Sequence, residues 1–224
     1  MTAPDVVARR IGTERQPIAI VDHFHPDADG LRAFAADACF EPARRQYPGV
    51  RGALPDDYFQ AVRPALSQVV AHVFGHRGGI ALLDASFSLV TTPPARLSIE
   101  QRLPHFDAVD PNRIALVHYL GTDDSGGTAF YRHRATGFET IDALRAPAYL
   151  GALSAEVRTA PPPAAYIAGS SAQFEQVSAV DARRNRAVIY RSALLHSGVI
   201  PARATLSDDP ARGRLTVTAF LSLT

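Results

Sequence analysis

His105, Asp107 and His196 have the residue types and spacing of a metal site. One residue separates His105 from Asp107, so in a strand their side chains project to the same face. His196 ends an apolar run and is followed closely by Gly198, a common position for a ligand at the mouth of a barrel. Two imidazoles and one carboxylate chelate a divalent metal and leave three positions open, which suits Fe(II). Taken singly, each histidine is more typical of a polar strand end or a hydrogen-bonded core residue.

The last strand-like segment, 213–220, adds a basic residue to this set. Its alternation places Arg214 and Thr216 on one face, and no acidic residue alternates with them. An Arg that faces the inside of a β-barrel needs an anionic partner, because an unpaired buried charge is costly. A dicarboxylate co-substrate, held by Arg214 and the Thr216 hydroxyl, satisfies that need. A salt bridge to Asp208 or Asp209 in the preceding loop is the alternative.

Composition removes several classes of function. All 23 basic residues are Arg, so Schiff-base chemistry, a P-loop lysine and a lysine general base are excluded. The single cysteine, Cys39, excludes an intrachain disulfide and Cys-based metal clusters. A net charge of +1 with scattered basic residues argues against a nucleic-acid partner. No apolar run approaches the roughly 20 residues that cross a bilayer, and the start lacks a signal-peptide core, so we expect a cytoplasmic protein without a membrane partner.

Hydrophobic periodicity predicts the elements that must position these residues. Helical spacing occurs over 30–39 and 56–74, and a further helix is expected within 139–157. The segment 41–55 is punctuated by Pro and Gly and reads as irregular. Short β-rich runs predict strands at 18–21, 80–90, 96–102, 114–120, 128–133, 166–168, 187–191, 193–199 and 214–223.

This order of elements favours the α+β class with a mainly β fold. We expect the N-terminal helices to pack on one sheet of a β-sandwich or jelly roll (cupin-like) core. A single domain is predicted over 1–224, with the N-terminal strand and helices in 1–79 and the jelly-roll core in 80–224.

Several segments together resemble the Fe(II)- and 2-oxoglutarate-dependent oxygenases, in their prolyl-4-hydroxylase-like branch. That family has a double-stranded β-helix, an H-x-D…H triad and a basic residue near the end of the chain that holds 2-oxoglutarate. The similar segments occur in the family's order, as IAIVDHFHPDADGLRAF (18–34), RLPHFD (102–107), IALVHYLGTDDSGGTAFY (114–131), VIYRSALLHSG (188–198) and GRLTVTAFL (213–221).

The resemblance implies a role for each matching residue. His105, Asp107 and His196 would hold iron, Arg214 and Thr216 would hold the distal carboxylate of 2-oxoglutarate, and Tyr119 would reach the same carboxylate; half-buried packing is an equally good account of Tyr119. The implied reaction uses O2 and decarboxylates 2-oxoglutarate to succinate while a substrate C–H bond is hydroxylated. Desaturation or ring closure are further outcomes of the same chemistry.

Two segments depart from the family pattern. The loop 201–213 lengthens the spacing between His196 and the last strand, so Arg203 and Arg212 are alternates for Arg214. Residues 132–165 form an insertion, and long insertions in compact domains are often functional. Candidate substrate contacts in or near it are Arg102, Tyr131, Arg132 and Arg145.

Three other functions compete with an oxygenase. A cupin-like metal- or ligand-binding protein would share the jelly roll, but it would not need Arg214 and Thr216 on the inner face. A scaffold that has lost activity would not need the intact triad. A nucleic-acid demethylase would need stacking surfaces, and the chain has no Trp. We therefore expect a small-molecule, amino-acid or peptide substrate, and a homodimer on the frequency of that assembly.

Overall fold

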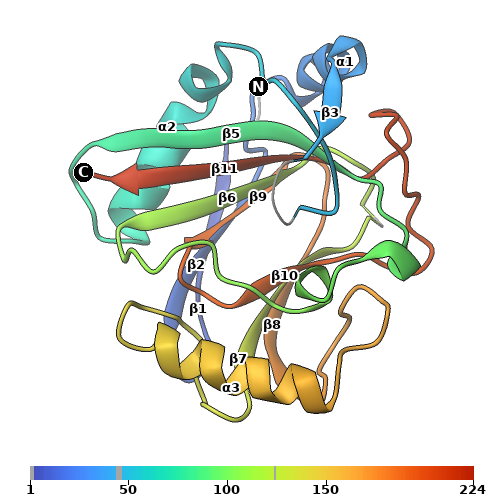
Figure 1. The fold of residues 1–224 in the computed structure, drawn as a ribbon. Helices are drawn as coiled ribbons and strands as arrows, with labels where there is room; N and C mark the ends of the chain where they lie inside the picture. The colour runs from blue at the N-terminus through green and yellow to red at the C-terminus, as the bar shows by residue number, and fades with distance from the viewer. Residues whose placement is uncertain (1–2, 44–46, 124) are drawn as a thin grey trace.

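The computed structural model describes residues 3–43, 47–123 and 125–224 (Figure 1). Within these residues it is a mainly β protein with antiparallel sheets and three α-helices. In chain order the elements are β1 (Asp5–Ile11), β2 (Gln16–Asp22), α1 (Ala28–Asp37), β3 (Phe40–Pro42), β4 (Gly49–Gly52), α2 (Tyr58–His72), β5 (Ile80–Val90), β6 (Arg113–Tyr119), β7 (Gly127–His133), α3 (Ala146–Thr159), β8 (Phe174–Asp181), β9 (Arg186–Arg191), β10 (His196–Val199) and β11 (Leu215–Leu223).

The strands form one large and one small sheet. The large sheet has the order β1-β2-β9-β6-β11-β5-β4-β3, and the small sheet has the order β10-β7-β8. β11 lies between β5 and β6, so the strand that follows Arg214 is paired on both sides. His196 begins β10 and is in register with Phe130 of β7. The strand that follows Arg214 and the strand that begins with His196 therefore lie in different sheets.

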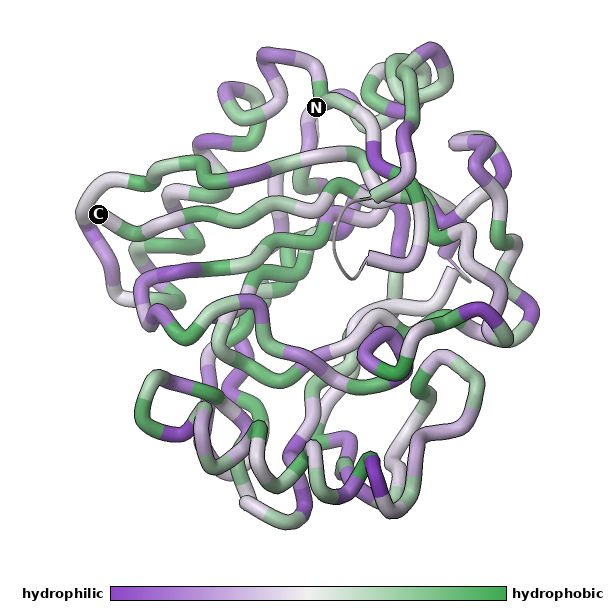
Figure 2. Tube along the Cα trace, in the orientation of Figure 1, coloured by the Kyte–Doolittle hydropathy of each residue, from purple (hydrophilic) through white to green (hydrophobic). Residues whose placement is uncertain are grey.

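Strand alternation sorts the side chains into layers. One face of the large sheet, including Val217 and Leu116, packs against Leu31 of α1 and Leu66 of α2. The other face meets the small sheet in an apolar cluster that includes Tyr190 and Phe130. A third cluster includes residues of the small sheet and of α3. Figure 1 shows α3 beside β7 and β8 at the bottom of the view. Figure 2 shows the hydrophobic stretches concentrated along the central strands.

Most of the predicted elements are present, and both N-terminal helices cover one sheet as expected. The predicted strand 96–102 is wrong, because short 3-10 helices at Pro94–Arg96 and Glu100–Arg102 follow the two prolines that disfavour a paired strand. The predicted strand 166–168 is also absent, and β8 was not predicted. Segment 41–55, which was expected to be irregular, contains β4 and most of β3; β4 pairs with β5, and β3 pairs with β4.

No helix in the part of the chain that the structure describes has both the length and the apolar character needed to span a membrane.

Truncating the helix–sheet interface tests this layering. Leu66 is 4% exposed and packs in the cluster between α2 and the large sheet. We expect Leu66→Ala to lower the free energy of unfolding by about 2–5 kcal/mol, because it leaves a cavity in a packed core. Gln68→Ala, an exposed position on the same helix, should leave stability nearly unchanged. Urea unfolding of both variants measures the difference, and equal stabilities would contradict the packing described here.

Candidate metal centre

Backbone hydrogen bonds bring His105, Asp107 and His196 together. The N–H of His105 donates to the carbonyl of His196, and the N–H of His196 donates to the carbonyl of His105, both at 2.9 Å. The Asp107 N–H donates to the Ser192 carbonyl at 2.8 Å. This bond holds Asp107 beside the chain that leads into β10. One ligand atom from each of the three side chains lies within 4.8 Å of the others. The geometry is that of a candidate metal centre.

The hydrogen bonds of His196 orient its ring for metal binding. Its Nδ1 lies 2.8 Å from the Leu194 carbonyl, so Nδ1 carries the proton and donates it. The other nitrogen, Nε2, then has a free lone pair and lies 3.5 Å from Asp107 Oδ2. This side chain is 6% exposed and packs with its ring centroid 4.7 Å from that of Tyr190. Such a carbonyl contact is the usual way in which a ligating histidine is held.

His105 is the more open of the two imidazoles, with 46% of its side chain exposed. Its Nε2 lies 3.8 Å from Asp107 Oδ1, and its ring centroid is 4.4 Å from that of His196. Partial loss of water around the ring, and then repulsion from His196, lower the pKa of His105, although Asp107 opposes the shift. The ring is therefore neutral at pH 7, and the neutral form is the one that binds metals.

The residues present fit a divalent cation. Asp107 Oδ2 is buried and has no hydrogen-bond partner within the described chain. Burial of a carboxylate oxygen without a donor is unfavourable, and such an atom in a native structure points to an unseen partner. Two histidine nitrogens face the same oxygen pair, which gives the N2O donor set of non-haem Fe(II) sites with open positions.

Arg214 lies in the interior between the sheets, 6% exposed. Its Nε donates to the Ser125 carbonyl at 3.0 Å and its Nη2 to the Gly127 carbonyl at 2.9 Å. Neither Asp208 nor Asp209 pairs with it, and among the described residues no carboxylate does. The backbone carbonyls hold the guanidinium in place but leave its charge without a counter-ion there.

Thr216 and Tyr119 lie close to this guanidinium. Arg214 Cζ is 5.6 Å from the centroid of the Tyr119 ring. Tyr119 is buried, with its hydroxyl 2.6 Å from Thr128 Oγ1, and burial raises its pKa while the Arg214 charge opposes that effect. The Thr216 hydroxyl donates to the Ser88 carbonyl at 3.3 Å. Leu215 and Val217 face the helices. Arg214 and Thr216, which alternate with them, therefore face the other side of the large sheet, as the sequence predicts.

Tyr190 is a neighbour of the site that the sequence analysis did not single out. Its ring lies against His196, and burial, followed by the charge of Asp107, raises its pKa well above the ordinary value. The Arg214 charge also acts on it, in the opposite direction. Alternation in β9 places Val188 and Tyr190 on the same face. This alternation is the sequence pattern from which the inward position of Tyr190 could have been predicted. Tyr190 thus lies near both the triad and the arginine.

Three of the four candidate substrate contacts have polar partners within the chain, whereas the buried Tyr131 hydroxyl has none among the described residues. Arg102 donates to the Leu97 carbonyl through Nη2 at 2.7 Å. Arg132 pairs with Glu139 at 2.7 Å, and Arg145 pairs with Glu14 at 2.7 Å. Tyr131 is fully buried in the cluster beneath α3, away from the layer that contains Tyr190. Their contact with a substrate stays a prediction.

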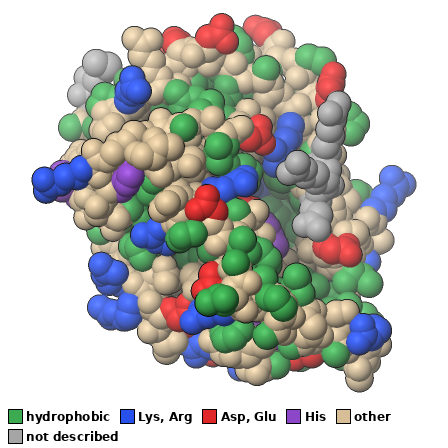
Figure 3. All heavy atoms as spheres, turned by 60° about the vertical axis from the view of Figure 1, so that its left-hand side comes forward, with side chains coloured by type: hydrophobic (Ala, Val, Ile, Leu, Met, Phe, Trp, Pro, Cys, Tyr) green, Lys and Arg blue, Asp and Glu red, His purple; other side chains and the backbone are tan. Residues whose placement is uncertain are grey.

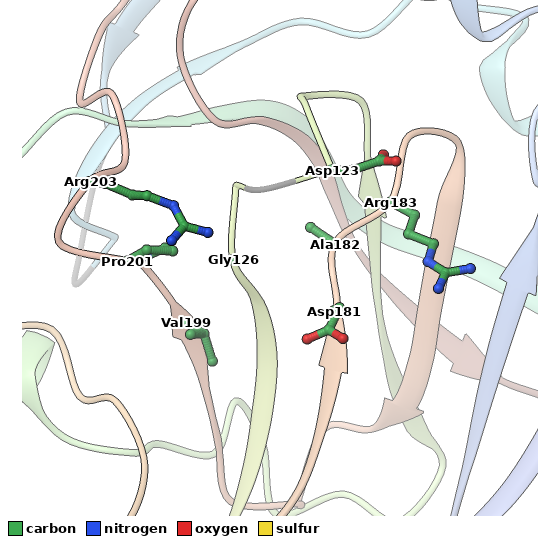
Figure 4. Close-up of a pocket in the computed structure, with 8 residues that line it drawn as sticks. All are labelled: Asp123, Gly126, Asp181, Ala182, Arg183, Val199, Pro201 and Arg203. Carbon is green, nitrogen blue, oxygen red and sulfur yellow. The ribbon is translucent and has the colours of Figure 1, made fainter.

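A separate cleft of about 520 Å³ opens where β7 begins and where β8 and β10 end (Figure 4). Its lining includes Asp181, Arg183 and Arg203, and no member of the triad. Arg203 therefore lies at a surface opening, and Arg212 is exposed, whereas Arg214 is buried. Figure 3 shows charged side chains of both signs spread over another face of the molecule.

Comparison with solved structures shows the fold that this chain shares. It is similar to HygX from Streptomyces hygroscopicus with nickel, 2-oxoglutarate and hygromycin B bound (TM-score 0.51, 11% identity, 94% of this chain and 84% of that one). It is similar to an N-substituted L-amino acid dioxygenase from Burkholderia ambifaria (TM-score 0.51, 14% identity, 100% and 97%). It is also similar to SnoN, a non-heme α-ketoglutarate-dependent epimerase of nogalamycin biosynthesis (TM-score 0.50, 11% identity, 93% and 78%).

No curated protein matches the sequence. A family model does match, over residues 2–221, and its description is a family of unknown function, DUF6445. Because the match covers nearly the whole chain, the protein belongs to the DUF6445 family.

Proposed function

We propose that this protein is a non-haem Fe(II)- and 2-oxoglutarate-dependent oxygenase, most simply a hydroxylase. The proposal rests on two charged groups in the interior, a carboxylate and a guanidinium, that have no partner of opposite charge among the described residues. Asp107 Oδ2 is buried without a donor beside two histidines, and Arg214 is buried without a carboxylate among the described residues. A metal ion satisfies the first group, and the distal carboxylate of 2-oxoglutarate satisfies the second.

In this proposal each site residue has one task. His105, Asp107 and His196 hold the iron, and the Leu194 carbonyl keeps the His196 ring in the ligating tautomer. Arg214 and Thr216 bind the distal carboxylate, and Tyr119 packs against the guanidinium that does so. Bound iron and 2-oxoglutarate supply the activation of O2. The protein itself orients the two ligands and one substrate C–H bond, and its buried walls limit access of water.

The finer assignment of the fold also belongs to the proposal. We infer a double-stranded β-helix core in the prolyl-4-hydroxylase-like branch, with the larger sheet covered by α1 and α2. The two facing antiparallel sheets and the fold shared with 2-oxoglutarate enzymes support it. HygX carries bound hygromycin B, and the Burkholderia enzyme is named for N-substituted L-amino acids. Both support a small molecule or an amino acid as the substrate here, and a peptide side chain stays a prediction from the sequence.

Metal binding by the triad is the first test. We expect the protein to bind Fe(II) under anaerobic conditions, and His196→Ala to weaken binding by more than about 100-fold, beyond the 10–100-fold cost of outer-shell changes. His72→Ala is the matched control, because His72 is an exposed histidine in the last turn of α2. Equilibrium dialysis measures both affinities. Equal affinities in the two variants would show that the triad does not hold the metal.

Co-substrate chelation is the second test. Anaerobic addition of 2-oxoglutarate to the Fe(II)-loaded protein should produce the weak visible charge-transfer band of the chelate. Arg214→Ala should raise the dissociation constant of 2-oxoglutarate at least about 100-fold, because it removes hydrogen bonds between charged groups worth about 1.5–3 kcal/mol each. Arg203→Ala, at the surface cleft, should bind normally.

The second test also separates the oxygenase from the cupin-like alternative. A wild-type protein that binds the metal but gives no band with 2-oxoglutarate is a metal-binding jelly-roll protein, and the proposal is then wrong. A band that persists unchanged in Arg214→Ala would remove Arg214 from the co-substrate site.

A further inference from the structure

Tyr47 has a buried hydroxyl group that lacks a hydrogen-bond partner in the described structure. It belongs to the connection between β3 and β4, outside every segment that resembles the oxygenase family. The Arg214 and Arg51 guanidinium groups and the Ser88 and Thr216 hydroxyls all act on its phenol, although no hydrogen bond of good geometry forms with any of them. Burial raises the pKa of Tyr47, and the Arg214 charge opposes that rise.

The backbone that follows Tyr47 is held against β5 and the residues after it. The Thr91 and Thr92 N–H groups both donate to the Pro48 carbonyl, each at 3.2 Å. Gly49 sits so close to β5 that a Cβ there would lie 1.9 Å from the Leu89 carbonyl oxygen, so only glycine permits this approach. Arg51 covers the outer face of the phenol, with Cζ 5.0 Å from the ring centroid. The position of the hydroxyl is therefore set by the fold.

The nearby hydroxyl groups form other hydrogen bonds, and in the described structure neither of them accepts from the Tyr47 phenol. Ser88 Oγ is 2.8 Å from Thr218 Oγ1, and the Thr216 hydroxyl donates to the Ser88 carbonyl. Arg214 offers only further N–H donors, which a phenol O–H proton cannot use. A phenylalanine would fill the same volume without burying an unsatisfied donor. Tyr47 thus places a spare O–H donor beside a guanidinium that no carboxylate of the described chain neutralises, and one carboxylate group would satisfy both.

We infer that Tyr47 is a further co-substrate-binding residue, whose phenol O–H donates to the carboxylate that Arg214 binds. The inference rests on the proposed function and extends the site to a part of the chain before β5. It assigns to Tyr47, just before β4, a role at the arginine end of the site. A ligand whose distal carboxylate reaches Arg214 gains both contacts, so Tyr47 favours a dicarboxylate over a 2-oxo acid that lacks a distal carboxylate.

The test compares Tyr47→Phe with Tyr149→Phe in the Fe(II)-loaded protein under anaerobic conditions. Tyr149 also has a buried hydroxyl without a partner, but it lies in the cluster beneath α3. Calorimetry should show 2-oxoglutarate binding about tenfold or more weakly to Tyr47→Phe, the effect of one hydrogen bond to a charged group, and normally to Tyr149→Phe. The affinity for 2-oxobutanoate, which has no distal carboxylate, should be the same in Tyr47→Phe and in the wild type.

Two further measurements separate binding from structure. The metal-free Tyr47→Phe protein should unfold at the wild-type temperature or above it, since the lost hydroxyl has no partner. Because the chain has no Trp, the ultraviolet difference spectrum on adding 2-oxoglutarate to the wild type reports tyrosines directly, and Tyr47→Phe should reduce it.

The outcomes are distinguishable. Normal 2-oxoglutarate affinity in Tyr47→Phe, with binding lost in Arg214→Ala, would overturn the inference and leave the proposed function intact. A lower unfolding temperature with equal loss of affinity for both oxo acids would make Tyr47 a structural residue. A wild-type protein that does not bind 2-oxoglutarate at all would overturn the proposed function, and this inference with it.

Discussion

The pair of backbone hydrogen bonds between His105 and His196 is the contact on which the candidate site depends. It joins the irregular segment after the 3-10 helices to the first residue of β10, and so fixes two imidazoles side by side. The bond from the Asp107 N–H to the Ser192 carbonyl then orients the carboxylate. None of these bonds uses a metal-binding atom. The protein can therefore present three converging ligands through its backbone, while the side chains keep their lone pairs for an ion.

The interior between the sheets carries a second constraint, which is the cost of buried charge. Arg214 is stabilised there by two carbonyls and by the Tyr119 ring, contacts that compensate its loss of water only in part. Tyr47, Tyr119, Tyr166 and Tyr190 all experience its charge. A core built only for stability would place apolar residues here. An arginine surrounded by phenols instead favours the recognition of an anion.

The alternation of apolar and polar residues was sufficient to predict the inner strands of the sheets but not the edge strands. Arg214 and Thr216 could be placed on the inner face because β11 alternates strictly between two buried sides. β8 pairs only with β7 and carries polar residues on both faces, so its periodicity is weak. The proximity of His105 to His196 follows from long-range pairing that no window of the sequence contains; resemblance to a family supplied it. Tyr47 lay in a segment read as irregular, and only the packing of its hydroxyl reveals it.

The insertion 132–165 has a structural role that bears on the metal ligands. Its residues Glu139 and Ile141 exchange backbone hydrogen bonds with the stretch before His196, through Leu195 and Ala193, each at 2.8 Å. The Glu139 carboxylate is buried but accepts from the N–H groups of the β1–β2 turn and from Arg132, and these bonds outweigh burial and lower its pKa.

The ion pairs of Arg132 and Arg145 have a structural role in this arrangement. Arg132 joins β7 to Glu139, and Arg145 joins the insertion to Glu14 of the β1–β2 turn. Glu139 in turn is bonded through its backbone to the chain that leads into β10. The orientation of the His196 ring depends on the path of residues 193–195. The insertion is bonded to these residues, and the N-terminal hairpin is bonded to the insertion, so both help to fix His196. The charges that first suggested substrate contacts can thus serve the site without reaching it, by holding the backbone from which the second histidine projects.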